Sequence, residues 1–237
     1  MSSRIEDLCH TLRLSGIASC ARELESSTFR DEIESFLISA LEGEYDVRMA
    51  RRRLNAIRIA GFPTMKRFDD LDIEALPDDG RMNLGMLKEL KFLEDHRNVL
   101  LIGNSGTGKT HLAIAAGIYA CEHNYRVMFK TTAGLVNELV EARQDRRITY
   151  LLRQLKRVDL LILDELGYIT FDLQGAELLF QLLASRYESS STLITSNLMF
   201  SEWVKVFHDK ALTAALLDRI THHAYILNMS GTSYRHR

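Results

Sequence analysis

The stretch Gly103-Asn104-Ser105-Gly106-Thr107-Gly108-Lys109-Thr110 has the pattern Gly-x-x-x-x-Gly-Lys-Thr. Glycines let such a loop curl until successive backbone N–H groups point at phosphate oxygens. The lysine then reaches the β- and γ-phosphates, and the threonine hydroxyl can ligate Mg²⁺. We therefore expect the loop and the residue after it to bind a nucleotide, through Gly103, Asn104, Ser105, Gly106, Thr107, Gly108, Lys109, Thr110 and His111.

The sequence around this loop alternates between strand and helix patterns. The apolar run Asn98-Val99-Leu100-Leu101-Ile102 precedes the loop and a helical pattern begins at His111, as a phosphate loop requires. Strands are predicted at 99–102, 126–131, 158–163, 192–195 and 224–227, with helices between them. This alternation predicts an α/β fold with a parallel five-stranded sheet, and a P-loop nucleotide-binding domain is the favoured class.

The first part of the chain has a different pattern. Up to about residue 60 it contains no proline, and its apolar residues recur at helical spacing, which predicts a small all-helical domain. Gly61-Phe62-Pro63 ends this pattern, because proline disfavours the α conformation in the residue before it and glycine caps helices. We therefore predict a helical N-terminal domain at 1–61, and a linker plus nucleotide-binding domain at 62–237.

Basic residues cluster on the last predicted helix of the N-terminal domain. This basic ridge consists of Arg48, Arg51, Arg52, Arg53 and Arg58. Three of its members, at positions 48, 51 and 52, share one helix face. Such a ridge could neutralise DNA phosphates without sequence preference. The alternative is a solvated helix face paired with nearby acids, namely Glu42, Glu44 and Asp46.

The composition is that of an ordinary globular protein with nearly balanced charge. Lys and Arg number 30 against 32 Asp and Glu, so a nucleic-acid surface must come from local clustering. Cys9, Cys20 and Cys121 are scattered, which argues against a disulfide framework or a zinc site. The adjacent His222 and His223 have no acid or cysteine at metal-ligand spacing. Without a signal core or an apolar run of ~20 residues, we expect a cytoplasmic protein and no membrane partner.

Two carboxylates follow an apolar predicted strand. Leu160-Leu161-Ile162-Leu163 leads directly to Asp164 and Glu165, at the sheet edge where open α/β folds place ligands. We expect Asp164 to hold Mg²⁺ together with Thr110, and Glu165 to orient or deprotonate a water that attacks the γ-phosphate. Asn197 follows another predicted strand and is a candidate to hydrogen-bond that water or the γ-phosphate. The alternative for Asn197 is a turn-forming asparagine.

Phosphoryl transfer commonly needs an arginine in addition to Mg²⁺ and a base. Arg219, just before the last predicted strand, is the first candidate, and Arg186 is the second. Either is alternatively a surface ion-pair partner. Arg235 near the chain end could contact the nucleotide of its own subunit, and its alternative is a frayed basic tail.

With these residues in view, the sequence resembles the IstB-like transposition helper ATPases, members of the AAA+ class that are related to the DnaC and DnaI helicase loaders. The resemblance covers nearly the whole chain. The phosphate loop occurs in any P-loop ATPase. Two other segments are specific to far fewer proteins, and they are Phe62-Pro63-Thr64-Met65-Lys66 and Asp164-Glu165-Leu166-Gly167-Tyr168. Further matching segments lie at 12–18, 175–181, 194–198, 215–219 and 233–235.

The resemblance implies an AAA+ ATPase domain, with ATP and Mg²⁺ as cofactors, behind the helical N-terminal domain. It implies a homo-oligomer that assembles on double-stranded DNA without strict sequence preference, then recruits and stimulates a partner transposase, IstA. In such proteins ATP binds between subunits, and Arg219 lines up best with the arginine finger of the helicase loaders. The loaders carry a further arginine where this chain has Ala215. Arg235 matches their second sensor arginine, and the basic ridge suits an assembly that wraps DNA.

Two other functions are compatible with parts of the sequence. A helicase loader would deliver a ring helicase to single-stranded DNA, and it would associate stably with that helicase. The N-terminal segment disfavours this alternative. A small-molecule P-loop kinase would need an arginine-rich lid and would act as a monomer without DNA. Glu165 directly after Asp164, and the absence of an evident lid, disfavour the kinase.

Overall fold

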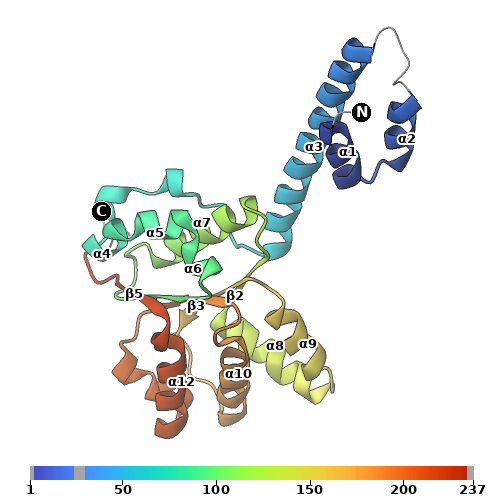
Figure 1. The fold of residues 1–237 in the computed structure, drawn as a ribbon. Helices are drawn as coiled ribbons and strands as arrows, with labels where there is room; N and C mark the ends of the chain where they lie inside the picture. Colours follow the sequence, from blue (N-terminus) through green and yellow to red (C-terminus); the bar gives the residue numbers. More distant parts are fainter. Residues whose placement is uncertain (1–2, 24–29, 234–237) are drawn as a thin grey trace. The chain divides into compact units, whose positions relative to one another are not determined.

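The computed structural model describes residues 3–23 and 30–233 (Figure 1). The chain forms two compact units, Met1–Asn55 and Ala56–Arg237. Within the described residues, no helix has the length and apolar character needed to cross a bilayer.

The described part of the first unit contains helices, a short turn and no strand, which confirms the all-helical prediction. It contains α1 (Ser3–Leu12), α2 (Ser15–Glu23) and the first part of α3 (Arg30–Ala60). Leu41 of α3 packs with apolar residues of the two shorter helices in a small core. The buried members of this core are Ile5, Leu8, Cys9, Leu12, Ala21 and Leu41.

The division between the two units falls inside α3. This helix ends before Gly61, whose φ of +77° lies in the left-handed region that glycine adopts without steric cost. The predicted boundary lies at this glycine, whereas the compact units divide a few residues earlier. The difference arises because Ala56, Ile57 and Ala60 pack into the core of the second unit. The assignment of separate functions to 1–61 and 62–237 stays a prediction.

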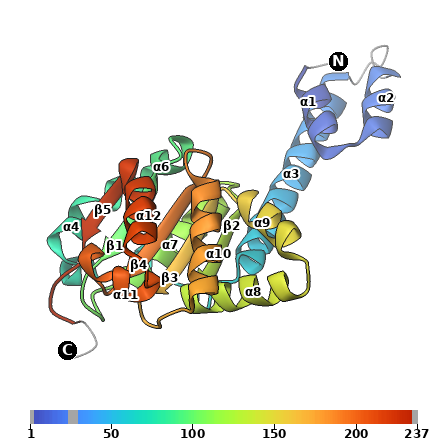
Figure 2. The same ribbon diagram turned by 90° about the horizontal axis from the view of Figure 1, so that it is seen from below.

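The second unit is built on a parallel five-stranded sheet in the order β2-β3-β4-β1-β5 (Figure 2). The strands are β1 (Asn98–Ile102), β2 (Val127–Thr131), β3 (Leu160–Leu166), β4 (Ser191–Ser196) and β5 (Ala224–Asn228). All five predicted strands are therefore present. β3 continues past its predicted end at Leu163, because a bulge between Leu163 and Leu166 lets its pairing with β4 resume.

Helices cover both faces of the sheet (Figures 1 and 2). α7 (Lys109–Glu122) lies on one face, and four other helices cover the opposite face. These four are α8 (Thr132–Gln144), α9 (Ile148–Lys156), α10 (Leu173–Arg186) and α12 (Lys210–His222). Leu100 and Leu101 are neighbours on β1 but belong to different cores. Successive strand residues point to opposite faces, so this division is expected of a sheet buried on both sides.

Short helices fill the remaining connections. The segment between α3 and β1, which includes the predicted linker, folds back on the face that carries α7. It contains η2 (Phe68–Asp70), η3 (Ile73–Ala75), α4 (Asp78–Met82), α5 (Leu84–Glu89) and α6 (Lys91–Glu94). After β4 the chain forms η4 (Phe200–Glu202) and α11 (Val204–Phe207).

Candidate active site

The predicted phosphate loop connects β1 to α7 at the carboxyl edge of the sheet. Its backbone turns at Gly106, with a φ of +80°, and at Gly108, with a φ of +91°. Glycine favours both conformations because it has no Cβ. Space is restricted as well, since a Cβ on Gly103 would overlap the backbone of Met229 and one on Gly106 would overlap the side chain of Ser233. The path of the loop and of the segment after β5 therefore requires glycine at these positions.

Lys109 is the first residue of α7, so the positive end of the helix dipole lies at the loop. Only 8% of its surface is exposed. Its Nζ donates to the carbonyl oxygens of Gly103 at 2.7 Å and Asn104 at 2.5 Å. Thr107 Oγ1 also donates to the Asn104 carbonyl, at 2.9 Å. The loop therefore holds a buried ammonium group beside a helix N-terminus, which is an arrangement suited to phosphate.

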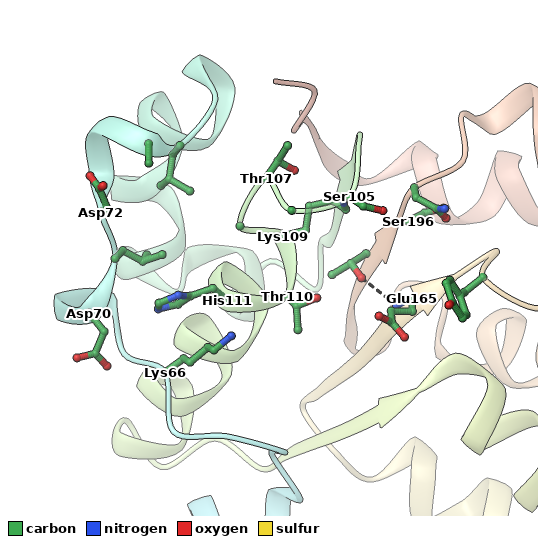
Figure 3. A pocket seen from close by; sticks show the side chains of 18 residues that line it. Lys66, Asp70, Asp72, Ser105, Thr107, Lys109, Thr110, His111, Glu165 and Ser196 are labelled. Carbon is green, nitrogen blue, oxygen red and sulfur yellow. Dashed lines mark hydrogen bonds between the residues drawn. The ribbon is translucent and has the colours of Figure 1, made fainter. Parts of the chain in front are cut away.

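A cavity of about 570 Å³ lies beside the loop (Figure 3). The predicted loop residues from Ser105 to His111 line it, together with Glu165 at the end of β3 and the residues that end β4. On the other side of the loop, Lys66 and Asp72 lie on the segment that follows α3 (Figure 3). A cavity of this size can enclose a nucleotide.

Thr110 and Asp164 meet at this edge of the sheet, although they lie far apart in the sequence. Thr110 Oγ1 donates to Asp164 Oδ1 at 2.9 Å, and Asp164 is 4% exposed. Hydroxyl and carboxylate oxygens are the ligands that Mg²⁺ prefers, so these two residues fit that cation. Glu165 differs from its neighbour because it is exposed and lines the cavity. Asn197, just after β4, is also exposed and lines the cavity.

The segment before β1 contributes a wall of the cavity that sequence reasoning missed. Its lining residues are Lys66, Asp70, Leu71, Asp72, Ala75 and Leu76. His111 Nε2 lies 3.2 Å from the carbonyl oxygen of Arg67, so the start of α7 is tied to this segment. The available signal was the segment from Phe62 to Lys66, which carried part of the family resemblance but was given no role.

The candidate arginines differ in where they lie in the structure. Arg219 lies in the last turn of α12, with its guanidinium carbon 5.1 Å from the ring centroid of Phe180. Because α12 leads directly into β5, Arg219 lies near the sheet edge opposite the phosphate loop. Asn98 at the start of β1 donates to the Ile220 carbonyl at 3.1 Å, which fixes this position. Arg235 lies outside the described residues.

The prediction of Arg186 as a second candidate for the arginine finger is wrong. It is 1% exposed, and its guanidinium donates to four oxygens within its own chain. The acceptors are the carbonyls of Leu155, Val158 and Ser191 and the hydroxyl of Thr192. Burial lowers the pKa of Arg186 to about 10, so the side chain stays charged at neutral pH. Its role is to join α9, α10 and β4.

We expect Arg186→Met to lower the free energy of unfolding by about 3 kcal/mol, because buried carbonyl groups would lose their donor. Urea denaturation followed by circular dichroism measures this change. The matched control is Arg157→Met, which alters an exposed arginine and should cost less than about 0.5 kcal/mol. Equal effects of the two substitutions would contradict the structural role of Arg186.

The members of the basic ridge differ in their contacts. In the first unit, Arg48 donates to Glu44 Oε1 at 2.6 Å and to the Leu12 carbonyl at 2.8 Å. Arg48 therefore fits the alternative for the basic ridge, in which an exposed arginine pairs with a nearby acid. The side chains of Arg51, Arg52 and Arg53 are exposed, and so is that of Arg58 in the second unit.

A surface cluster forms where sequence spacing predicted none. Glu188 follows α10 and approaches the end of α12, so that it and His222-His223 offer ligand atoms within 4.8 Å of one another. His223 Nε2 lies 3.8 Å from Glu188 Oε1, and the Tyr187 hydroxyl lies 3.0 Å from His222 Nδ1. Chain spacing could not predict the cluster because Glu188 reaches it only through the packing of α10 against α12. Its side chains are exposed and already pair with one another.

Solved structures share the architecture of the second unit. DnaI superposes with a TM-score of 0.59 at 24% identity, over 74% of this chain and 93% of its own. AMPPCP-bound DnaA from Aquifex aeolicus gives 0.58 at 21% identity, over 73% of this chain and 53% of its own. The DnaC helicase loader gives 0.54 at 20% identity, over 72% and 96%. Identities this low establish the fold alone.

The fold and the site define a P-loop nucleotide-binding protein. Its sequence relatives identify the family within this class. The IstB-like ATP binding protein family matches residues 8–237, and the chain belongs to this family. The ATP-binding protein of insertion sequence IS5376 from Geobacillus stearothermophilus is 37% identical over 239 residues, covering 100% of this chain and 95% of the relative. That of IS21 from Pseudomonas aeruginosa is 36% identical over 233 residues, covering 98% and 88%.

Proposed function

We propose that the chain hydrolyses ATP to ADP and phosphate in the cavity beside the phosphate loop. One observation carries the proposal: the exposed Glu165 lines the same cavity as Lys109 and Thr110. A carboxylate there can accept a proton from the water whose oxygen bonds to the γ-phosphorus, while the bond from that phosphorus to the bridging oxygen breaks. Asn197, on the same cavity, would hydrogen-bond the water or the γ-phosphate.

Further groups would bind the phosphates and their cation. Lys109 and the N–H groups at the start of α7 supply positive charge at the loop. Thr110 and Asp164, joined by a hydrogen bond of 2.9 Å, would hold Mg²⁺. When bound, Mg²⁺ neutralises charge on the β- and γ-phosphate oxygens.

We infer that the hydrolysis site is shared between subunits of a homo-oligomer. Arg219 lies near the opposite sheet edge from the loop of its own chain, so it can only serve a nucleotide held by a neighbour. An arginine supplied in this way stabilises the charge that develops on the transferred phosphoryl group. By the family resemblance, Arg235 would contact the nucleotide within its own subunit.

The proposed partner of the oligomer is double-stranded DNA, bound without sequence preference through the basic ridge. Arg51, Arg52 and Arg53 support this because they are exposed on one helix. Each arginine that neutralises a phosphate releases condensed counterions, which makes binding sensitive to salt. Arg48 contributes less, because Glu44 already pairs with it.

Replacing Arg51, Arg52 and Arg53 together by alanine should weaken DNA binding and reduce its log–log salt slope by roughly three. Fluorescence anisotropy with a labelled duplex at several salt concentrations measures both quantities. The control removes the same charge from exposed positions of the second unit, by alanine at Arg143, Arg153 and Arg157. If the ridge variant and the control give the same slope as the unaltered protein, the ridge does not bind DNA.

We propose that this DNA-bound ATPase selects target DNA for an insertion sequence and stimulates an IstA-like transposase. The support is that relatives described as insertion sequence ATP-binding proteins match the helical N-terminal region as well as the ATP-binding domain. The alternative is a helicase loader like DnaC, whose structure matches 72% of this chain.

The proposed function is tested by measuring ATP hydrolysis and particle mass with and without DNA. Stimulation of hydrolysis by double-stranded DNA, together with a large particle, supports the transposition role. A preference for single strands and a stable complex with a replicative helicase would support the loader instead.

A further inference from the structure

The carboxyl ends of β3 and β4 are joined by a bulge. The pairing shifts between Leu163 and Leu166 of β3, so that Asp164 and Glu165 both lie opposite Thr195 of β4. In a regular strand these neighbouring acids would point to opposite faces of the sheet. A bulge changes the direction of side chains locally, and bulges are common beside active sites.

The hydroxyl group of Thr195 contacts both acidic residues. It donates to Asp164 Oδ1 at 2.6 Å and accepts from the backbone N–H of Glu165 at 2.9 Å, the dashed line at Glu165 in Figure 3. Thr195 is 1% exposed. Thr110 Oγ1 donates to the same Asp164 oxygen at 2.9 Å. One buried hydroxyl thus donates a hydrogen bond to the proposed cation ligand and accepts one from the backbone N–H of the proposed base.

Glu165 needs such support because its backbone is strained. Its φ of +59° lies in the left-handed region, which a residue with a Cβ adopts at a cost. A conformation of this kind persists only where neighbouring groups hold it. The hydrogen bond from the Glu165 N–H to Thr195 is such a restraint, at the residue whose carboxylate must meet the attacking water.

We propose that Thr195 is a positioning residue that fixes the carboxylates of Asp164 and Glu165 relative to each other. This inference rests on the proposed ATP hydrolysis. Thr195 acts through the two acids, since its hydroxyl is already used by both. Valine has the shape of threonine but neither donates nor accepts a hydrogen bond, whereas serine does both.

The bulge has other hydrogen bonds that do not involve Thr195. Thr132 Oγ1 donates to the Asp164 carbonyl at 2.9 Å, and Ser196 Oγ donates to the Leu166 carbonyl at 2.7 Å. These contacts hold the backbone on both sides of Glu165. Loss of the Thr195 hydroxyl is therefore expected to displace the two carboxylates without unfolding the sheet.

The test compares Thr195→Val with Thr195→Ser, and uses Thr213→Val as the control. Thr213 is 5% exposed on α12, where its hydroxyl donates to the Asp209 carbonyl. Steady-state kinetics give kcat and KM for ATP. Titration of a fluorescent ATP analogue in Mg²⁺ and in EDTA gives the gain in affinity due to the cation, which does not depend on hydrolysis.

Thr195→Val should lower kcat about 30-fold and reduce the Mg²⁺-dependent gain in affinity about tenfold, with affinity in EDTA within about twofold. Thr195→Ser should retain kcat within about threefold, and Thr213→Val should change neither quantity by more than about twofold. A valine variant that matches Thr213→Val in both readouts would overturn the proposal.

Two further outcomes are informative. If Thr195→Val and Thr195→Ala both unfold, as judged by thermal melting, while Thr195→Ser is unaffected, Thr195 is a structural residue and the proposal is overturned. If the unaltered protein does not hydrolyse ATP, the proposed hydrolysis fails instead. The comparison of affinity in Mg²⁺ and EDTA then still decides whether Thr195 positions Asp164.

Discussion

Glu165→Gln should reduce ATP hydrolysis by a factor of about a thousand while leaving ATP affinity within about threefold. Glutamine keeps the size of the side chain but cannot take a proton from the attacking water. The phosphates would be bound by other groups, Lys109 and the N–H groups at the start of α7, which the substitution leaves in place. Release of phosphate under saturating ATP measures the rate, and titration with a fluorescent ATP analogue measures the affinity.

A matched substitution separates this effect from a general loss of charge. Glu177 is exposed on α10 and does not line the cavity. Glu177→Gln should therefore hydrolyse ATP at the rate of the unaltered protein. Because ATP remains bound, the Glu165→Gln variant should also accumulate as the ATP-bound assembly. Hydrolysis by Glu165→Gln at the unaltered rate would remove Glu165 from the proposed chemistry.

Arg219→Ala should lower hydrolysis by a factor on the order of a thousand, again with ATP still bound. The loss follows if Arg219 stabilises charge on the phosphoryl group in the neighbouring subunit. Arg219→Lys should not restore the rate, because lysine lacks the planar fork of the guanidinium. Phosphate release measured at a protein concentration that favours assembly checks both variants.

The contact of Arg219 with Phe180 requires a stability control. Loss of a cation–π contact at a partly exposed site costs about 1 kcal/mol at most, so the variant should remain folded and melt within a few degrees of the unaltered protein. Lys210→Ala removes a positive charge from the other end of α12 and should leave hydrolysis unchanged. If Arg219→Ala hydrolyses ATP as fast as Lys210→Ala does, another arginine must act as the finger.

Local sequence patterns were sufficient for the sheet and for the phosphate loop. The predicted strands are short and alternate with helices along the second unit, and that alternation is typical of a sheet covered on both faces. The loop was recognisable because backbone geometry restricts the residue types it accepts, most clearly at Gly106 and Gly108. Asp164 could be paired with Thr110 because the carboxyl ends of parallel strands meet at one edge of the sheet.

Features that depend on packing between distant segments could not be predicted. Arg186 could be named as a candidate arginine, but its burial could not be predicted, because its acceptors come from the end of α9 and the start of β4. The segment from Lys66 to Leu76 lacks a regular pattern, and only the folded chain brings it to the cavity. The link from Thr195 to both acids depends on a bulge, which shifts strand register without a sequence signal of its own.

The central claim is that the loop from Gly103 to Thr110 forms one half of a hydrolysis site and that Arg219 of a neighbour forms the other. It is tested most directly by mixing Glu165→Gln with Arg219→Ala before ATP is added. Both variants should bind ATP and assemble, and each should be nearly inactive by itself. In an equal mixture, about a quarter of the interfaces would join an intact Glu165 to an intact Arg219 of the next subunit, so hydrolysis should recover to about that fraction. A mixture that forms mixed assemblies yet hydrolyses ATP no faster than the sum of its two components would contradict a shared site.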